Sequence, residues 1–147
     1  MPPELPEPRS RPIEQIRFYV DEDILGVGYA LMWSRPDAVT CGIEPVAEEL
    51  PRGIRDVDWI PRVAAHGWVA ITKNHKILTN PIEAQIVVEA QAGIVGFAGS
   101  SGNMTSWQMV TLLARHWTAI ENQIAMAPPG PWWLSVSQKT NLLRYRT

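Results

Sequence analysis

The chain has 147 residues, of which 46% are hydrophobic and 19% are charged, which predicts one globular domain and excludes a coiled coil or a disordered chain. Thirteen basic and 15 acidic residues leave a formal net charge of -2, which excludes nucleic-acid binding driven by bulk charge and leaves only local contacts. The single cysteine, Cys41, excludes an intramolecular disulfide and a cysteine-based zinc site, and suits a reducing compartment such as the cytoplasm. No apolar run approaches the ~20 residues of a membrane span.

Proline and charged residues dominate the start of the chain, which predicts a flexible N-terminal tail over residues 1–15 and a single domain over residues 16–147. Within that domain, short apolar runs of the β type alternate with helical patterns. The expected strands are residues 17–20, 38–41, 68–72 and 94–98. The run 68–71 is apolar throughout instead of alternating, which indicates a strand covered on both faces, as in a parallel sheet.

Helices are expected between these strands. Their predicted positions are 24–33, a segment that begins with the N-cap Asn80 and stops at Gly93, and 106–124 behind a capping box of Thr105 and Gln108. Residues 42–55 are expected to form a long loop, and residues 132–136 and 141–145 an edge hairpin around a turn at 138–140. Together these elements predict an α/β fold in three layers, a mainly parallel sheet flanked by helices with a C-terminal β-hairpin.

The seven tryptophans and the histidines divide between core and surface. The expected core tryptophans are Trp59, Trp68, Trp107 and Trp117, and the expected partner contacts are Trp33, Trp132 and Trp133. For the long helix, the predicted buried stripe is Trp107, Val110, Leu113, Ala114, Trp117 and Ile120. Cys41 is expected in the core, His66 at a helix C-terminus and His116 on a helix surface, without a metal-spaced partner for either histidine.

Polar residues follow each expected strand, where ligands bind in parallel α/β sheets. The candidates are Asp21, Glu22 and Asp23 after the first strand, Asp56 and Asp58 at the start of the next helix, Thr72, Lys73, Asn74, His75 and Lys76 after the third strand, and Ser101 after the fourth. Carboxylates about 4 to 6 Å apart need a compensating cation, and oxygen ligands favour Mg²⁺ or Mn²⁺ over Zn²⁺. Such an ion polarises a phosphoryl oxygen and activates water, while Lys73 and Lys76 could hold flanking phosphates.

Some of these acids also have structural explanations. Asp58 is a good N-cap that would place Pro61 at the tolerated position N3, whereas Asp56 has less structural reason to be acidic. Asp21 follows a buried strand and has no evident capping role, which favours a functional role. Glu22 and Asp23 are adjacent, so at most one should face inward, and Asp23 could cap the helix that follows.

Four segments in order resemble the PIN-like domain family that includes VapC-type toxin ribonucleases. They are Phe18-Tyr19-Val20-Asp21, Asp56-Val57-Asp58-Trp59, residues 67–74 and residues 101–105. The resemblance implies a PIN-like α/β/α fold, Mg²⁺- or Mn²⁺-dependent hydrolysis of RNA phosphodiesters and a cognate antitoxin partner. It makes Asp21 the metal ligand of the first strand, Asp56 or Asp58 the acid of the next helix, and Thr72 with Asn74 the Thr-x-Asp signature. A homodimer is a further expectation by analogy.

The chain departs from that signature because Asn74 stands where the pattern has an aspartate. An amide oxygen can coordinate a metal, but it brings no charge and cannot accept a proton from water as a carboxylate does. Two hypotheses therefore stand. In the first, Asp21, Asp56 and Asp58 hold the ion of a ribonuclease, Asn74 completes the site, and Lys73, Lys76, Arg62, Thr72 and Ser101 contact RNA. In the second, a catalytically reduced PIN-like module binds RNA or a protein without cleavage.

Overall fold

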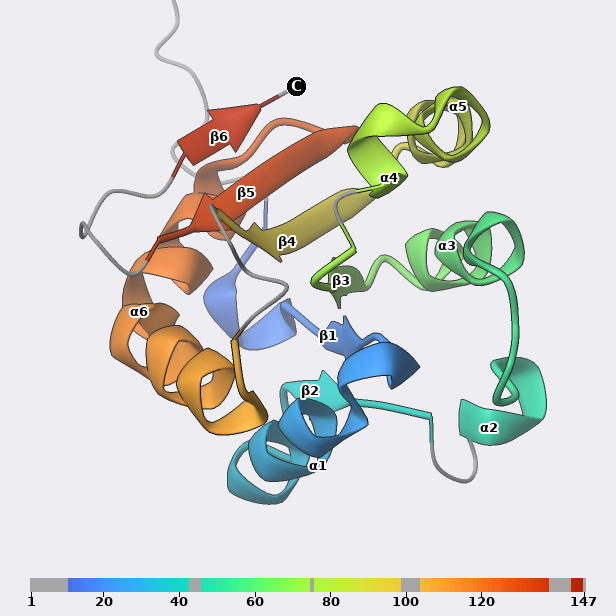
Figure 1. Ribbon diagram of the computed structural model, residues 1–147. Helices are drawn as coiled ribbons and strands as arrows, with labels where there is room; N and C mark the ends of the chain where they lie inside the picture. Colours follow the sequence, from blue (N-terminus) through green and yellow to red (C-terminus); the bar gives the residue numbers. More distant parts are fainter. Residues whose placement is uncertain (1–10, 43–45, 75, 99–103, 138–143, 147) are drawn as a thin grey trace, which may run out of the picture.

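The computed structural model describes residues 11–42, 46–74, 76–98, 104–137 and 144–146, and it contains a six-stranded sheet of order β2-β1-β3-β4-β5-β6 (Figure 1). The strands are β1 (Phe18–Val20), β2 (Val39–Thr40), β3 (Val69–Ile71), β4 (Gly93–Phe97), β5 (Trp132–Val136) and β6 (Arg144–Arg146). All neighbouring strands are parallel except β5 and β6, which form the predicted antiparallel hairpin. The predicted turn at 138–140 lies outside the described residues.

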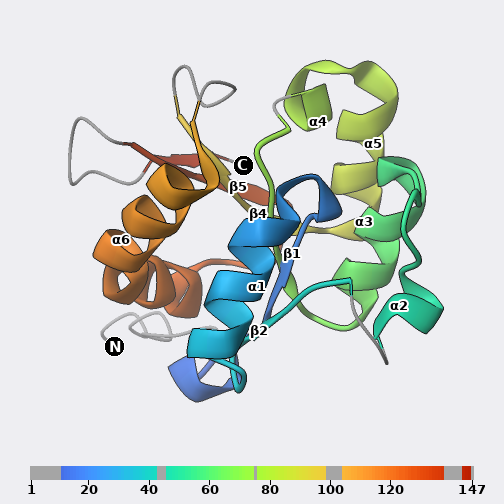
Figure 2. The same ribbon diagram turned by 60° about the horizontal axis from the view of Figure 1, so that its bottom comes forward.

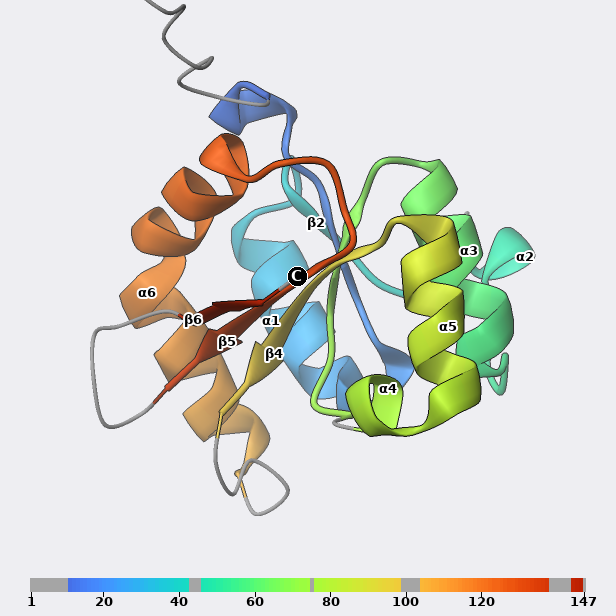
Figure 3. The ribbon, with the colours of Figure 1, turned by 90° about the horizontal axis from the view of Figure 1, so that it is seen from above.

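Helices cover both faces of the sheet. The helical segments are η1 (Ile13–Gln15), η2 (Glu22–Ile24), α1 (Leu25–Ser34), α2 (Val46–Glu49), α3 (Asp56–Ala65), α4 (Lys76–Thr79), α5 (Pro81–Ala90) and α6 (Ser106–Met126). Viewed from above, the sheet separates α1 and α6 from α3 and α5 (Figure 3). The predicted three-layer α/β fold is therefore confirmed. No helix among the described residues is long and apolar enough to cross a membrane.

Strands β1 and β3 and most of β4 and β5 are buried on both faces, as the continuous apolar run 68–71 predicts for β3. Alternate residues of one strand enter different clusters, so that Phe18 and Val20 pack on the side of α1 and α6, and Tyr19 packs on the side of α3 and α5. The resulting core has two parts, one on each face of the sheet. This double coverage leaves the ends of the strands as the places where polar side chains can gather.

The connections that leave β1 and β3, which are neighbours in the sheet, run to opposite faces. The chain leaves β1 through η2 for α1 on one face, and leaves β3 for α4 and α5 on the other face (Figure 2). Neighbouring parallel strands whose connections separate in this way leave a crevice at their carboxyl ends, and ligands of open α/β sheets bind there. The fold therefore places Asp21 and Thr72, which follow these two strands, at the same end of the sheet.

One predicted helix ends earlier than expected, and one short helix was not predicted. The capping box of Thr105 and Gln108 at the start of α6 and the Asn80 cap of α5 are confirmed. However, α5 ends at Ala90 because Gln91 adopts the left-handed conformation, with φ of 55°, before Gly93 is reached. The segment 42–55 is not loop throughout, since it contains the short helix α2.

Trp132 and Trp133 are core residues, and their prediction as partner contacts is wrong. They are 4% and 3% exposed. Each indole fills the space beside a glycine of the neighbouring strand, because a Cβ atom on Gly93 would overlap the ring of Trp132 and one on Gly96 would overlap the ring of Trp133. Sequence periodicity gives no signal of this complementarity between two strands, which resembles the aromatic covering of strand glycines in other sheets.

The buried stripe of α6 is rotated from its predicted position. Trp107 and Ala114 are exposed, whereas Met109, Leu112 and His116 are buried beside Leu113 and Trp117. The prediction of a surface His116 is therefore wrong, because that residue is only 5% exposed. Both stripes satisfy the helical period, so the contact with β5 and α1 decides between them.

The complementarity of Gly96 and Trp133 predicts an intolerance to the smallest side chain. Gly96→Ala should lower the free energy of unfolding by about 2 kcal/mol or more, since the added methyl group overlaps a buried ring. Thermal unfolding measures the change. Gly42→Ala is the matched control, because its Cβ atom would lie 3.9 Å from its nearest neighbours. Equal melting temperatures for the two variants would contradict the packing described.

Candidate active site

Asp21 lies at the carboxyl end of β1 and is only 3% exposed. Its Oδ2 atom accepts a hydrogen bond of 2.8 Å from the Thr72 hydroxyl, and its Oδ1 atom accepts one of 3.2 Å from the Asp23 backbone N–H. The second bond makes Asp21 the N-cap of η2. The expectation that Asp21 has no capping role is therefore wrong, and the same side chain joins β1 to the end of β3.

Burial dominates the electrostatics of Asp21. Removal from water raises the pKa of Asp21 to about 6, against the opposing effect of the hydrogen bonds from Thr72 and Asp23. The negative charges of Asp23 and Asp56 raise it further. A carboxylate that is costly to ionise and lies among other carboxylates is the kind of group that a cation would stabilise.

Thr72 connects Asp21 to the other polar residues. Its hydroxyl oxygen accepts a bond of 3.1 Å from the Asn74 backbone N–H, and the Asn74 side-chain Nδ2 donates to Asp56 Oδ2 at 2.7 Å. The Lys76 backbone N–H donates to Asn74 Oδ1 at 3.0 Å, which fixes the amide orientation because a carboxylate only accepts and an N–H only donates. We call the four residues Asp21, Thr72, Asn74 and Asp56 the acid network.

Asp56 is the first residue of α3, and its side chain joins the acid network through the hydrogen bond from Asn74. The Trp59 indole Nε1, one turn along the helix, donates to Asp56 Oδ1 at 2.7 Å, so both carboxylate oxygens accept a hydrogen bond from the protein. The position at the start of a helix also favours a negative charge. Asp56 is therefore held in one orientation from two sides.

Asp58 does not join this group in the structure. It is the third residue of α3, whose N-cap is Arg55, and it pairs with the Arg55 guanidinium at 3.0 Å. The prediction of Asp58 as the N-cap is wrong because the N-cap is Arg55, three residues earlier, and the helix begins at Asp56. Pro61 is consequently inside the helix, where its missing N–H leaves one backbone bond unmade.

The predicted RNA contacts occupy different places. Lys76 is exposed at the start of α4 and Lys73 is half-buried in the loop before it. Arg62 donates to the Glu49 carbonyl at 2.6 Å, in the second half of α3, and Thr72 is fully buried within the acid network. Ser101 and His75 lie outside the described residues, as do Gly102 and Asn103 of the last matching segment.

Glu83 is a site neighbour that the sequence interpretation missed. The sequence explains it as the third residue of α5, but Asn80 caps that helix with its own side chain, and Glu83 instead lies near Asp56. Its Oε2 atom is buried and has no hydrogen-bond partner. Burial first, and then the Asp56 carboxylate, raise the pKa of Glu83, while the Lys76 charge lowers it. Only the packing of α3 against α5, which the sequence does not reveal, brings these acids together.

The comparison with protein families agrees with this fold and site. A family model described as a PIN like domain matches residues 16–99, which is more than half of the chain, so the chain belongs to the PIN-like domain family. Domains of this family are typically nucleases and generally use divalent metal ions. No curated protein and no solved structure matches the chain.

Asp21 and Asp56 fit a divalent ion whose other coordination positions are left to water and substrate. Mg²⁺ commonly takes only one or two protein carboxylates and fills its other positions with water and substrate phosphate. Asp21 and Asp56 supply two, and each of their oxygens keeps a lone pair beyond the hydrogen bond it accepts. Glu83, whose buried Oε2 atom has no hydrogen-bond partner, is a further acid near Asp56. Among the described residues, no three acidic, histidine or cysteine side chains gather to enclose a metal by themselves.

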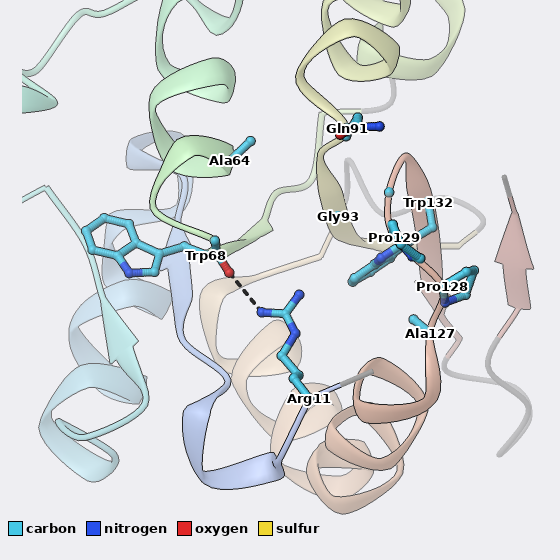
Figure 4. Close-up of a pocket in the computed structure, with 11 residues that line it drawn as sticks. Arg11, Ala64, Trp68, Gln91, Gly93, Ala127, Pro128, Pro129 and Trp132 are labelled. Carbon is cyan, nitrogen blue, oxygen red and sulfur yellow. Dashed lines mark hydrogen bonds between the residues drawn. The ribbon is translucent and has the colours of Figure 1, made fainter. Parts of the chain in front are cut away.

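A separate pocket lies at the opposite, amino-terminal edge of the sheet (Figure 4). Gly67, Gly93 and Trp132, at or next to the starts of three strands, contribute to its wall, and the Arg11 guanidinium donates to the Gly67 carbonyl at 2.8 Å within it. None of its described lining residues is acidic. This pocket therefore offers no carboxylate to a cation, and the acid network remains the candidate site.

The raised pKa of Asp21 predicts a pH dependence of stability in the metal-free protein. Because the folded-state pKa of about 6 exceeds the usual value of about 4, the folded chain binds more protons between these values, and its free energy of unfolding should fall as pH rises through them. Asp21→Asn should remove this decline and raise the free energy of unfolding at pH 7 by up to about 3 kcal/mol.

Denaturant unfolding in EDTA at pH 4 to 7 measures this effect. Asparagine can keep the cap and the contact with Thr72, so the variant should fold. Asp37→Asn, which removes an exposed carboxylate 3.7 Å from Arg35, is the control and should follow the wild-type curve. A decline in Asp21→Asn as steep as that of the wild type would refute the assignment.

Proposed function

We propose that this chain is a divalent-metal-dependent endoribonuclease, the toxin of a type II toxin–antitoxin pair, with Mg²⁺ or Mn²⁺ as its ion. The observation that carries the proposal is the hydrogen-bonded connection from buried Asp21, at the divergence of β1 and β3, to Asp56 at the start of α3. Family membership supports nuclease chemistry in general. The all-oxygen donor set favours a hard ion over zinc.

In this proposal Asp21 and Asp56 hold the ion, and the ion when bound supplies polarisation of a phosphoryl oxygen and a water of lowered pKa. Thr72 and the Asp23 N–H orient Asp21, and Trp59 and Asn74 orient Asp56. Such donors fix the direction of each carboxylate, which is the usual work of groups behind a metal ligand.

Substrate contacts would come from the cations nearest the acid network. Lys76 is exposed and close enough to lower the pKa of Glu83, and Lys73 precedes Asn74 directly. These ammonium groups could hold the phosphates that flank the scissile bond. Arg62, which is bonded to Glu49, has weaker structural support for this role.

The partner surfaces are also part of the proposal. An antitoxin or a second copy of the chain would need exposed apolar residues, and of the three predicted contact tryptophans only Trp33, 79% exposed on α1, is accessible. Exposed aromatic side chains are enriched at protein interfaces. Trp132 and Trp133 are unavailable because they pack in the core.

A second function, RNA or protein binding without cleavage, is favoured by one observation. The Asn74 amide donates a hydrogen bond to Asp56, so it compensates that carboxylate without a cation. A site satisfied in this way needs a metal less than a site with an aspartate at position 74. RNA or partner affinity that survives EDTA and Asp21→Ala would distinguish this function.

Cleavage of single-stranded RNA should require both the ion and Asp21. Purified protein should cleave RNA in Mg²⁺ or Mn²⁺, lose cleavage in EDTA, and lose at least about 100-fold in rate on Asp21→Asn or Asp21→Ala, because a ligand to the ion is removed. Gel analysis of labelled RNA gives the rates, with Asp37→Asn as control. The absence of both metal-dependent cleavage and metal binding in the wild type would reject the proposal.

Asn74→Asp should strengthen metal binding about tenfold and raise cleavage, because it adds a carboxylate beside Asp56. The same variant should be less stable in EDTA, since it replaces the donor of the 2.7 Å bond by a second acceptor. Calorimetric titration with Mn²⁺ and thermal unfolding measure the two effects. Asn122→Asp, on the exposed face of α6, is the control with the same charge change.

A silent wild type whose Asn74→Asp variant cleaves RNA would establish the binding module as the native function. Unchanged metal affinity in Asn74→Asp would instead place the ion away from position 74.

A further inference from the structure

The Glu22 carboxylate makes a hydrogen bond that its own helix does not require. Glu22 directly follows Asp21 and is the first residue of η2. That helix is already capped, because the Asp21 side chain accepts from the Asp23 backbone N–H. The half-buried Glu22 side chain reaches away from η2, and its Oε1 atom accepts a bond of 2.8 Å from the Gly53 backbone N–H, 31 residues further along the chain. Glu22 therefore joins the end of β1 to a distant segment.

Gly53 belongs to a tight turn just before α3. The Ile54 N–H donates to the Pro51 carbonyl at 3.2 Å, and Gly53, the third residue of the turn, has a φ of 81°. A positive φ at this position is typical of a type II turn and favours glycine. The turn itself uses only the N–H of its fourth residue, so the Gly53 N–H is left for an outside acceptor. Glu22 is that acceptor, and its bond holds the turn against η2.

The turn sets the position of Asp56, because Gly53 lies only three residues before it. The segment before the turn is joined to α3 itself, where Arg62 donates to the Glu49 carbonyl at 2.6 Å. This contact holds the segment to the second half of α3 and does not involve β1. The bond from Gly53 to Glu22 differs from it, because it connects the start of α3 to the end of β1.

Two separate connections therefore run between Asp21 and Asp56. The first is the acid network, whose members are joined by hydrogen bonds of 2.8, 3.1 and 2.7 Å. The second passes along the chain from Asp21 to Glu22, across the 2.8 Å bond to Gly53, and on to the start of α3. Carboxylates that bind one ion must keep a fixed separation and direction, which depend on the groups behind them. The second connection restricts movements that the acid network alone would leave.

We infer that Glu22 is a positioning residue of the proposed metal site, which holds the start of α3, and with it Asp56, at a fixed place relative to Asp21. This inference rests on the proposed function. In this role Glu22 contacts neither the ion nor the RNA, and it acts only as the hydrogen-bond acceptor of Gly53. A neutral side chain of the same shape with a carbonyl oxygen should therefore replace it.

The test compares Glu22→Ala with Glu22→Gln in the full chain by calorimetric titration with Mn²⁺. Glu22→Ala removes the acceptor and should lower the affinity for Mn²⁺ about tenfold, the scale of losses when groups behind a metal ligand are removed. Glu22→Gln keeps an acceptor oxygen and should stay within about threefold of the wild type. A residue that acted through its charge would instead lose as much affinity in Glu22→Gln as in Glu22→Ala.

A second measurement needs no metal. In EDTA, hydrogen exchange of the Asn74 side-chain amide, followed by NMR, reports the bond from Asn74 to Asp56. These protons should exchange about tenfold faster in Glu22→Ala, because Asp56 is less firmly held, and at the wild-type rate in Glu22→Gln. Glu48→Ala, which changes an exposed glutamate of α2, is the matched control and should leave both measurements unchanged.

The Asp56→Asn background shows whether Glu22 acts through Asp56. There, Glu22→Ala should cost at most about twofold in Mn²⁺ affinity, because both changes remove the same contribution to binding. A loss as large as in the wild-type background would overturn the inference, since Glu22 would then act on another part of the site.

Wild-type Mn²⁺ affinity in Glu22→Ala would also overturn the inference, even with a lower melting temperature, because the contact would then serve stability alone. Equal affinity losses in Glu22→Ala and Glu22→Gln would do the same, as would an Asn74 amide exchange rate that Glu22→Ala leaves unchanged. In each case, Mn²⁺ binding that depends on Asp21 would leave the proposed function standing. A wild-type chain that binds no Mn²⁺ at millimolar concentration would overturn both.

Discussion

The hydrogen bond between Thr72 and Asp21 joins the two strands at which the sheet sends its connections to opposite faces. The Asp21 backbone N–H also donates to the Ile71 carbonyl at 2.9 Å, so side chain and main chain close the same junction. The Thr72 hydroxyl oxygen in turn accepts a hydrogen bond from the Asn74 backbone N–H, and the Asn74 side-chain amide donates one to Asp56. The acid network is built around this junction. Strands β1 and β3 end there, and α3, which carries Asp56, begins beside it.

The junction concentrates negative charge where water is scarce, and this costs stability. The pKa of Asp21 is raised mainly by burial, and that of Glu83 by burial and by Asp56. Such costs are typical of sites where electrostatics serve function instead of folding. Asn74 lowers this cost in stability because its neutral amide donates a hydrogen bond to the Asp56 carboxylate. The chain therefore combines an acid network that a neutral donor partly compensates with the fold of the PIN-like domain family.

Much of the layout could be predicted from sequence because it depends on local rules. Continuous apolar runs located β1, β3 and β4, and capping residues located the starts of α5 and α6. The rule that parallel strands end at one edge brought Asp21, Asp56 and Asn74 together, and the structure joins these three by hydrogen bonds through Thr72. The features that could not be predicted depend on contacts between residues distant in sequence. The burial of Trp133 needs Gly96, the rotation of α6 needs β5, and the proximity of Glu83 to Asp56 needs the packing of two helices.

The two tryptophans of β5 have a mechanical consequence. Trp132 enters the cluster under α1 and α6, and Trp133 enters the cluster under α3 and α5, each seated on a glycine of β4. One indole of β5 therefore packs on each face of the β4–β5 pair. A shift of either helical layer across this pair would displace an indole. In the proposed function, β4 and β5 would form the fixed frame, and adjustment to a bound polynucleotide would involve β1, β3 and the first turns of the helices around them.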